Sequence, residues 1–368
     1  MKALVITPGA GTGARLVEVE TPEPGPDEVL VAVRCVGLDG TDTELIRGEY
    51  GEAPPGESQL IFGHESLGIV ERVGAQVRDV APGDLVVAMV RRPDGCAACA
   101  SGEPDMCIEG NYRERGIKGI HGFLAERYVE SPAYLVKVPP ALREIGVLLE
   151  PLSVVEKGLR HAWRIQERMK AWEPKKALVL GAGSIGQFAA MLLRLRGVET
   201  YVTARHPNPT ISSRMEAIGA EFIPQQDDAG DVKVHLADFP ALRGPFDFVF
   251  EATGNASVAM GAMRVIGNDG ITCLASVTGG ESQVEICASC LNVELVLGNR
   301  CVFGTVNANR VDFESGAQDL ARVSSRWPGW LEGMISRRVP LARFAEALTK
   351  HPGDIKVVIE IARQAPLA

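Results

Sequence analysis

A glycine-rich loop between a predicted strand and a predicted helix constrains the fold of this chain more than any other feature. Residues 176–180 have the composition of a buried strand, the loop Gly181-Ala182-Gly183-Ser184-Ile185-Gly186 follows at once, and residues 187–196 have a helical pattern. The glycines permit a tight turn and close backbone approach, so that a pyrophosphate can lie on the amides at the helix N-terminus. The succession predicts a dinucleotide-binding, doubly wound α/β sheet. A glycine-rich turn without a ligand is the alternative.

The end of the next predicted strand, residues 199–203, indicates which dinucleotide is bound. A site for NAD places Asp or Glu about 20 residues beyond the glycines, at the ribose hydroxyls. This chain has Ala204-Arg205-His206 instead, and a cation favours the 2′-phosphate of NADP. We therefore predict NADP, with NAD as the second choice. The alternative for Arg205 is a solvated loop residue. The predicted cofactor contacts are Gly181, Gly183, Ser184, Ile185, Gly186, Arg205 and His206.

The first third of the chain has a different character, because short strand-like segments alternate with Gly and Pro breaks. Segments 1–7, 28–36, 68–73 and 84–90 predict a compact β-barrel. A helical pattern over 153–169 leads toward the dinucleotide domain, which continues with strands at 246–251 and 270–276. The last strand-like segment, 355–361, resembles the first region. We expect domains at 1–157 and 158–304, with 305–368 returning to the first.

Composition excludes several classes of function. The chain has 368 residues, of which 46% are hydrophobic and 23% charged, as expected for two ordinary globular domains. The formal net charge of −9 disfavours nucleic acid as a partner. We expect no membrane association, because no apolar run is long enough to span a bilayer. A leader-like N-terminal segment is not apparent, and we expect a cytoplasmic protein with reduced cysteines.

A possible metal site lies in the predicted barrel. His64 and Glu65 stand in a Gly-bounded turn between apolar segments, with Asp39 upstream and Glu150 downstream. Zinc accepts imidazole and carboxylate donors and keeps an open position in catalytic sites. The alternatives are a satisfied core imidazole for His64 and a turn residue beside Gly40 for Asp39.

The spacing around His64 resembles the signature of the zinc-dependent medium-chain dehydrogenases and reductases. Gly63-His64-Glu65, Gly68, Gly74 and Val77 match that signature without a gap, and the glycine loop and C-terminal return match as well. The resemblance implies a GroES-like β-barrel catalytic domain joined to a Rossmann domain. It is nearest to the archaeal-type glucose 1-dehydrogenases, through three segments: Glu150-Pro151-Leu152 with the following Glu156-Lys157, residues 113–117, and Val306-Asn307.

The resemblance also assigns roles to individual residues. Asp39 stands where the family usually has a zinc-binding cysteine, His64 matches the second ligand, and Glu65 and Glu150 match carboxylates that bind zinc directly or through water. Thr41 matches a hydroxyl that relays a proton, and Asn307 is implied in cofactor as well as sugar binding. The residues implied to contact the sugar are Thr41, Glu114, Glu150 and Asn307.

A second cluster of cysteines matches the family's structural zinc lobe. Cys96, Cys99 and Cys107 are present, the first cysteine of the family pattern is missing, and Asp94 is a possible fourth ligand. The alternative is a reduced, metal-free loop. Cys287 and Cys290 have CxxC spacing without a second pair, and we interpret them as packing residues of a helix rather than as a redox pair. Cys35, Cys273 and Cys301 fall in apolar segments, which predicts buried thiols.

Together these features predict a zinc-dependent enzyme that oxidises an aldose, D-glucose, at C1 to the lactone and transfers hydride to NADP. A polyol or alcohol dehydrogenase with the same zinc is one alternative. A metal-free, NADPH-binding sensor protein is an alternative from a different class. The family resemblance also implies a homodimer or homotetramer.

Overall fold

The computed structural model describes residues 1–279 and 282–361. It divides into two compact units, which we call unit 1 (Met1–Ser153 with Asn307–Ala368) and unit 2 (Val154–Val306). The domain divisions expected from the sequence, after residues 157 and 304, lie within four residues of these. Within the described residues, no helix combines the length and apolar character needed to cross a bilayer.

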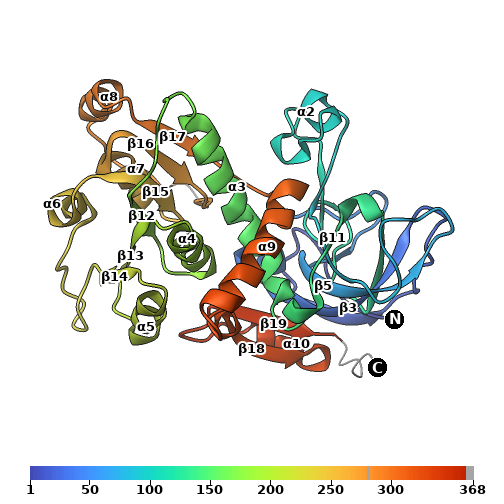
Figure 1. Cartoon of the computed structure of the whole chain (residues 1–368). Helices are drawn as coiled ribbons and strands as arrows, with labels where there is room; N and C mark the ends of the chain where they lie inside the picture. Colours follow the sequence, from blue (N-terminus) through green and yellow to red (C-terminus); the bar gives the residue numbers. More distant parts are fainter. Residues whose placement is uncertain (280–281, 362–368) are drawn as a thin grey trace. The chain divides into compact units, whose positions relative to one another are not determined.

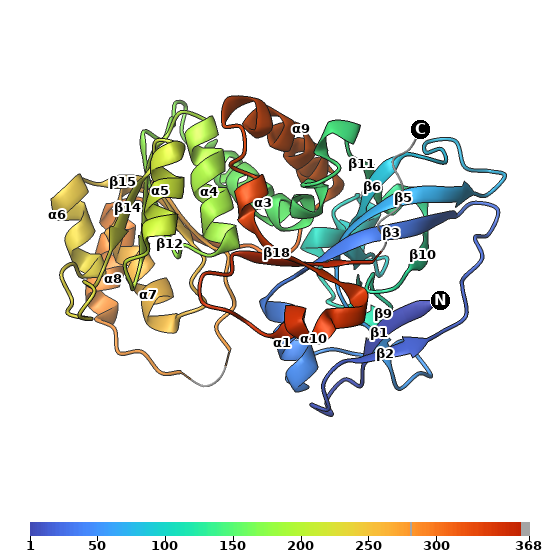
Figure 2. The same cartoon turned by 90° about the horizontal axis from the view of Figure 1, so that it is seen from below.

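Unit 2 is built around a six-stranded parallel sheet with the strand order β14-β13-β12-β15-β16-β17. The strands are apolar because helices cover both faces of such a sheet, and α4 and α5 lie on one side while α6 and α7 lie on the other (Figures 1 and 2). Its elements are α3 (Leu149–Gln166, which begins in unit 1), β12 (Lys176–Leu180), α4 (Ser184–Leu195), β13 (Glu199–Ala204), α5 (Pro209–Ala217), β14 (Glu221–Pro224), α6 (Phe239–Arg243), β15 (Phe246–Glu251), α7 (Ala256–Val265), β16 (Ile266–Leu274), α8 (Ala288–Leu297) and β17 (Cys301–Gly304).

The core of this sheet follows from the apolar strand segments seen in the sequence. Leu178 and Leu180 of β12 pack with Phe246 and Val249 of β15 in one buried cluster. From β12 the chain continues through β13 and β14 on one side of the sheet and then returns to β15, β16 and β17 on the other side. In open α/β sheets, ligands bind at the point where the strand order changes direction in this way. The glycine loop leaves β12 at this point.

One interpretation of the sequence is wrong in unit 2. Cys287 and Cys290 flank the start of α8 as expected, but both are exposed and joined by a disulfide rather than packed in a core. Cys273 is fully buried in β16, whereas Cys301 in β17 is only half-buried. The helix pattern was visible in the sequence, but the side of the helix that faces solvent was not.

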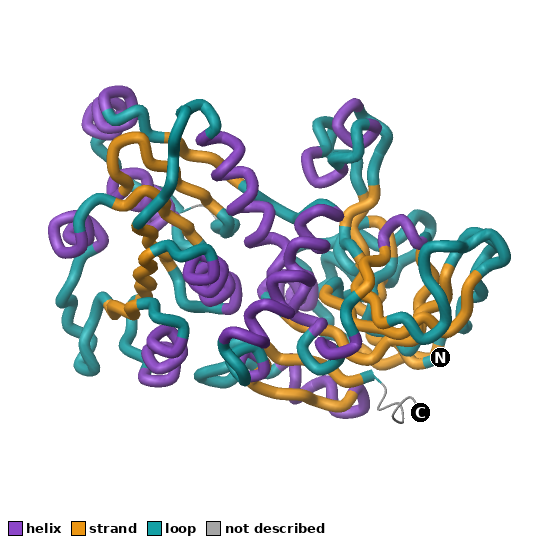
Figure 3. Tube along the Cα trace, viewed as in Figure 1, coloured by secondary structure: helices purple, strands orange, loops and turns teal. Residues whose placement is uncertain are grey.

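Unit 1 consists mainly of strands and loops, with several short helices and the 17-residue α9 (Figure 3). Its central sheet has seven strands in the order β11-β6-β5-β3-β19-β18, with β10 also paired to β3, and two three-stranded sheets accompany it. The elements are β1 (Lys2–Ile6), β2 (Arg15–Glu18), β3 (Val29–Leu38), α1 (Gly40–Arg47), β4 (Leu60–Ile61), β5 (Glu65–Val73), β6 (Leu85–Ala88), β7 (Arg91–Arg92), α2 (Ala97–Ala100), β8 (Arg113–Arg115), β9 (Gly119–Ile120), β10 (Arg127–Glu130), β11 (Leu135–Lys137), α9 (Arg310–Arg326), β18 (Ile335–Pro340), α10 (Phe344–Leu348) and β19 (Lys356–Glu360).

The C-terminal strand β19 lies between β3 and the edge strand β18 of the central sheet. It pairs antiparallel with β3, with Val357 opposite Leu38 and Glu360 opposite Cys35. Val357 and Ile359 enter the same buried cluster as Val31 and Val33 of β3. A segment more than 300 residues away in the chain therefore joins the sheet whose strands β3 and β5 adjoin the possible metal ligands Asp39, His64 and Glu65.

Candidate active site

Asp39 has two roles in the structure, because it starts helix α1 and also faces His64. Its Oδ1 accepts the Asp42 N–H at 3.2 Å, and the Asp39 N–H donates to Asp42 Oδ2 at 3.0 Å, which together form a capping box. Its Oδ2 lies 3.7 Å from His64 Nε2. The turn-residue alternative for Asp39 is thus compatible with a site role, since each function uses a different oxygen.

His64 immediately precedes β5 and is 6% exposed. Its Nδ1 lies 4.0 Å from Asp42 Oδ1, and both of these atoms are buried without a hydrogen-bond partner among the described residues. Such orphaned polar atoms are costly in a protein interior unless a ligand or ion satisfies them. The alternative of a satisfied core imidazole does not fit this histidine.

The carboxylates around His64 change its protonation. Burial favours the neutral ring, but Asp39, Glu150, Asp42 and Glu65 together outweigh burial and raise the pKa of His64 to about 9. Burial, reinforced by the charges of Glu65 and Asp39, raises the pKa of Glu150 to about 8. Protons therefore occupy the site at neutral pH when no metal ion is there.

Glu65 is tied to the C-terminal strand. Both of its oxygens accept from Lys356 Nζ, at 2.6 and 2.7 Å, and both side chains are 2% exposed. A Cβ at Gly37 would lie 2.1 Å from Glu65 Oε2, so only glycine leaves room for this carboxylate. Lys356 was missed in the sequence, because nothing local connects a lysine in β19 to a glutamate 291 positions earlier.

The donor set fits a zinc ion. His64 groups with Asp39 and Asp42, and also with Glu65 and Glu150, with the donor atoms of each group within 4.8 Å of one another. Two donors at ~2.1 Å from one tetrahedral zinc lie about 3.4 Å apart, close to the 3.7 Å between Asp39 and His64. Four acidic side chains face one histidine and one lysine, and a divalent cation would balance this excess. Asp42 was not predicted, although its position three residues after the helix-capping Asp39 is a sequence signal for a capping box.

Glu114 and Asn307 are brought together from distant parts of unit 1. Asn307 Nδ2 donates to Glu114 Oε1 at 2.9 Å, and Arg91 donates to the same oxygen from Nε at 3.0 Å and Nη2 at 2.9 Å. Arg91 also lies 3.7 Å from the centre of the Tyr112 ring. All these bonds converge on Oε1, and no described residue donates to Oε2. Arg91 is a further residue that the sequence did not indicate.

Thr41 lies beside Asp39 in unit 1, and the glycine loop joins β12 to α4 in unit 2. Thr41 Oγ1 donates to Asp39 Oδ2 at 3.4 Å. In unit 2, a Cβ at Gly186 would lie 1.9 Å from the Gly181 oxygen, which requires glycine there. Gly183 begins α4 without a side-chain cap, and the half-buried Ser184 and Ile185 form its first turn. Arg205 and His206 are exposed just beyond β13.

The cysteine lobe gathers the four residues expected from the sequence. Asp94, Cys96, Cys99 and Cys107 have their donor atoms within 4.8 Å of one another. The sulfurs of Cys96 and Cys107 are 3.9 Å apart, and two sulfurs on a tetrahedral zinc would be about 3.8 Å apart. Asp94 Oδ2 accepts from Cys107 Sγ at 3.0 Å. Asp94 therefore lies close enough to the three cysteines to act with them on one ion.

Comparison with known proteins agrees with the fold. Residues 25–140 match the family model of the alcohol dehydrogenase GroES-like domain, and residues 143–361 match that of the glucose dehydrogenase C-terminus. The chain is 46% identical over 364 residues to glucose 1-dehydrogenase of Methanocella arvoryzae, covering 98% of this chain and 99% of that protein. It is 41% identical over 362 residues to glucose 1-dehydrogenase of Thermoproteus tenax, with the same coverage.

A solved structure gives the same answer in three dimensions. Haloferax mediterranei glucose dehydrogenase in complex with NADP, zinc and gluconolactone superposes with a TM-score of 0.89 at 31% identity, over 99% of this chain and 100% of that chain. The fold and both family matches define an oxidoreductase of the zinc-type medium-chain dehydrogenase class. Within that class, the chain belongs to the glucose dehydrogenase family.

Proposed function

We propose that this enzyme oxidises D-glucose at C1 to the lactone, with zinc as the catalytic metal and NADP as the hydride acceptor. The observation that carries the proposal is the pair of groups that share the buried His64, one with the half-buried Asp39 and one with the buried Glu65 and Glu150, whose donor atoms and excess negative charge suit zinc. Full-length similarity to glucose 1-dehydrogenases supports glucose as the substrate.

Asp39, His64 and Glu150 would hold the zinc ion. When bound, zinc supplies a Lewis acid that lowers the pKa of a coordinated hydroxyl. Asp39 keeps Oδ1 on the amide of Asp42, which leaves Oδ2 for the metal. Glu65 could join the ligands only by giving up its bonds to Lys356, because both of its oxygens are engaged there. We therefore assign Glu65 a ligand role that depends on release from Lys356.

Thr41 would move the proton that leaves the C1 hydroxyl. Its hydroxyl lies 3.4 Å from Asp39 Oδ2 and is half-buried, so it can accept a proton on the side of the site and release one toward solvent. A hydroxyl suits this task because the same group can donate and accept.

Glu114 and Asn307 would select the sugar. Three N–H donors hold Glu114 through Oε1 and leave Oε2 for a sugar hydroxyl. A substrate without that hydroxyl would leave a buried carboxylate oxygen unpaired, which is a strong basis for discrimination. Glu150, as a neighbour of His64, would contact the hydroxyl that reacts, and Thr41 would lie beside it.

The glycine loop and the end of β13 would bind NADP in unit 2, and NADP supplies the electrophilic nicotinamide carbon that takes the hydride. Gly181, Gly183 and Gly186 give the pyrophosphate access to the first amides of α4, including those of Ser184 and Ile185. Arg205 and His206 would contact the 2′-phosphate, and the family resemblance implies that Asn307 is a further cofactor-binding residue. NAD would be a poorer acceptor, because it lacks the group that Arg205 recognises.

Two further features belong to the proposal. The Asp94, Cys96, Cys99 and Cys107 lobe would bind a structural zinc. Strand β17 is at the edge of its sheet and could pair with the same strand of a second copy, which would give a homodimer or, with a further interface, a homotetramer. Light scattering on the purified protein measures this assembly.

A substrate panel tests the proposed function. Zinc-loaded enzyme is assayed with glucose, with 1-deoxyglucose as the matched control that lacks the reacting hydroxyl, and with sorbitol, each with NADP and NAD. We expect reduction of NADP by glucose and none by 1-deoxyglucose. Activity with sorbitol but not glucose would favour a polyol dehydrogenase. Tight binding of NADPH by a protein that binds no zinc at His64 would favour the sensor alternative.

A further inference from the structure

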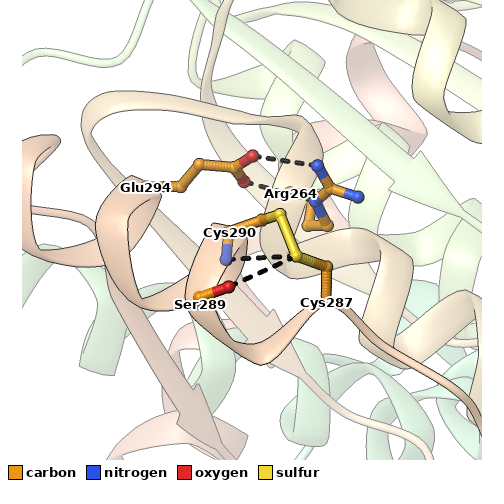
Figure 4. The surroundings of a disulfide bond; sticks show 5 residues. All are labelled: Arg264, Cys287, Ser289, Cys290 and Glu294. Atoms are coloured by element: carbon orange, nitrogen blue, oxygen red, sulfur yellow. Dashed lines mark hydrogen bonds and ion pairs between the residues drawn. A yellow bond between two sulfur atoms is a disulfide. The ribbon is translucent and has the colours of Figure 1, made fainter.

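Cys287 and Cys290 form an exposed cross-link that has no part in the proposed dehydrogenase chemistry. Their Cα atoms are 5.3 Å apart and they lie at positions three residues apart around the start of α8 (Figure 4). All four residues from Cys287 to Cys290 are exposed.

The fold gains little from this cross-link. A disulfide stabilises chiefly by restricting the unfolded chain, and the restriction decreases as the closed loop becomes shorter. Cys287 and Cys290 are separated by only three positions and lie in the same helical turn, which the helix already orders. The bond joins no two elements, so the exposed site is poorly suited to a structural role.

The local geometry favours sulfur chemistry instead. Cys287 is the N-cap of the ten-residue α8, and the Cys290 N–H donates to its sulfur at 3.3 Å. A helix N-terminus and a donated N–H both stabilise a thiolate. Ser289 Oγ lies 3.6 Å from the same sulfur and can also donate to it. The nearby Glu294 is paired with Arg264 at 3.0 Å, which offsets its negative charge (Figure 4).

The other cysteines provide a contrast within the same chain. Burial raises the pKa of Cys35 to about 12, and burial also raises the pKa of Cys273. Both are nearly inaccessible to solvent, at 5% and 0% exposure. Cys96, Cys99 and Cys107 belong to the metal-type lobe. Cys287 and Cys290 thus combine solvent access, a partner sulfur and stabilisation of a thiolate.

We propose that Cys287 and Cys290 form a thiol–disulfide exchange site for low-molecular-weight thiols and their disulfides. An external thiolate attacks one sulfur of the pair, forms a mixed disulfide and releases the other cysteine as a thiolate, and α8 favours release of Cys287. A second external thiolate attacks the external sulfur of the mixed disulfide. The products are two protein cysteines and one external disulfide, so two electrons pass from two thiols to the protein disulfide.

The experiment uses the full-length protein and glutathione as the probe. Two samples, one of oxidised and one of reduced protein, are equilibrated in the same mixtures of reduced and oxidised glutathione. Each sample is quenched with acid and alkylated, and the peptide containing residues 287–290 is analysed by mass spectrometry. We expect the same intermediate state from both sides. The ratio of disulfide to dithiol should rise about tenfold for a tenfold rise in oxidised glutathione divided by the square of reduced glutathione.

Single variants provide the matched controls. Cys290→Ser should accumulate one glutathione on Cys287, because no second sulfur can expel it, and Cys287→Ser should do so more slowly. Cys273→Ser should leave the titration unchanged. The proposal is overturned if the pair stays fully oxidised in reduced glutathione alone, or fully reduced in oxidised glutathione alone. The proposal is also overturned if Cys287 reacts with glutathione no faster than the buried Cys273.

Discussion

At the residue scale, the proposed zinc site is a set of charges, all buried except the half-buried Asp39, in which acidic groups outnumber cations unless a metal ion is present. The acidic members are Asp39, Asp42, Glu65 and Glu150, and the described residues beside them supply His64 and Lys356 as cations. Without a metal, protons make up part of the difference, which is why the pKa values of His64 and Glu150 are raised to about 9 and about 8. Zinc binding must displace these protons.

The first prediction is that Glu150→Gln lowers the number of protons released on zinc binding. At neutral pH Glu150 is mostly protonated in the metal-free site, because its pKa is about 8, and the variant should release roughly one proton fewer per zinc. Calorimetric titration of metal-free protein in two buffers of different ionisation enthalpy gives the number. The cysteine lobe contributes equally to both proteins. Equal release by the variant and the parent would show that Glu150 was already ionised.

The second prediction concerns Arg91, which orients Glu114 without contacting the metal-type residues. Arg91→Lys keeps the charge but loses the two-pronged contact with Oε1, so KM for glucose should rise about tenfold while KM for NADP is unchanged. Steady-state kinetics with each substrate varied in turn measures both constants. Arg113→Lys, at an exposed neighbouring position, is the control. An unchanged KM for glucose in Arg91→Lys would remove Arg91 as a positioning residue.

The third prediction separates the two nicotinamide cofactors. Arg205→Ala should raise KM for NADP by about 10- to 100-fold, because one charge-assisted contact with the 2′-phosphate is lost, and should change KM for NAD little. Arg205→Lys should recover part of the loss. Kinetics with both cofactors at saturating glucose decides the matter. Equal effects on NADP and NAD would mean that Arg205 is a solvated loop residue.

At the element scale, strand β19 links the end of the chain to the proposed metal site. Lys356 reaches both oxygens of Glu65 from this strand, and burial leaves neither charge with access to water. Removing one partner of such a pair leaves the other charge uncompensated, which costs more than the pair itself contributes.

The fourth prediction follows from this geometry. Lys356→Met should lower the free energy of unfolding by about 3–5 kcal/mol, and adding Glu65→Gln should restore part of the loss. Denaturant unfolding of metal-free protein measures both effects. Lys350→Met, at an exposed lysine in the loop before β19, should change stability by about 0.5 kcal/mol or less. If Lys356→Met and Lys350→Met were equally stable, the pair would carry no such energy.

The elements themselves could mostly be predicted from the sequence. Strand β12 has the predicted bounds of 176–180, and β15 those of 246–251, because each is a compact apolar segment between breaks. Helix α3 begins at Leu149, four residues before the predicted start, since Pro151 fits the first turn of a helix and did not need to precede it. Local patterns therefore predict which helices and strands form better than they predict the residue at which each one begins or ends.

The site could be predicted only where a motif carries it. His64, Asp39 and the glycine loop have local signatures, and the expected residues of the cysteine lobe lie together. Arg91 and Lys356 have none, because their partners are 23 and 291 positions away and only the folded sheets bring them together. The exposed Cys287–Cys290 bond was missed for a related reason, since the pattern of α8 does not reveal which of its faces is covered.

At the scale of the whole molecule, each unit carries one part of the chemistry. The metal-type and sugar-type residues, Asp39, His64, Glu114, Glu150 and Asn307, all belong to unit 1, and the glycine loop with Arg205 belongs to unit 2. In the proposed reaction, hydride passes from C1 of glucose to the cofactor. Neither a binding protein nor an enzyme acting at another carbon of the sugar would do this.

Glucose labelled with deuterium at C1 tests this claim most directly. Zinc-loaded enzyme is incubated with the labelled sugar and NADP, and the reduced cofactor is weighed and examined by NMR. The account predicts one deuterium at C4 of the nicotinamide ring for each lactone formed, and a slower rate than with unlabelled glucose if hydride transfer limits turnover. Reduced cofactor that contains no deuterium would contradict the account.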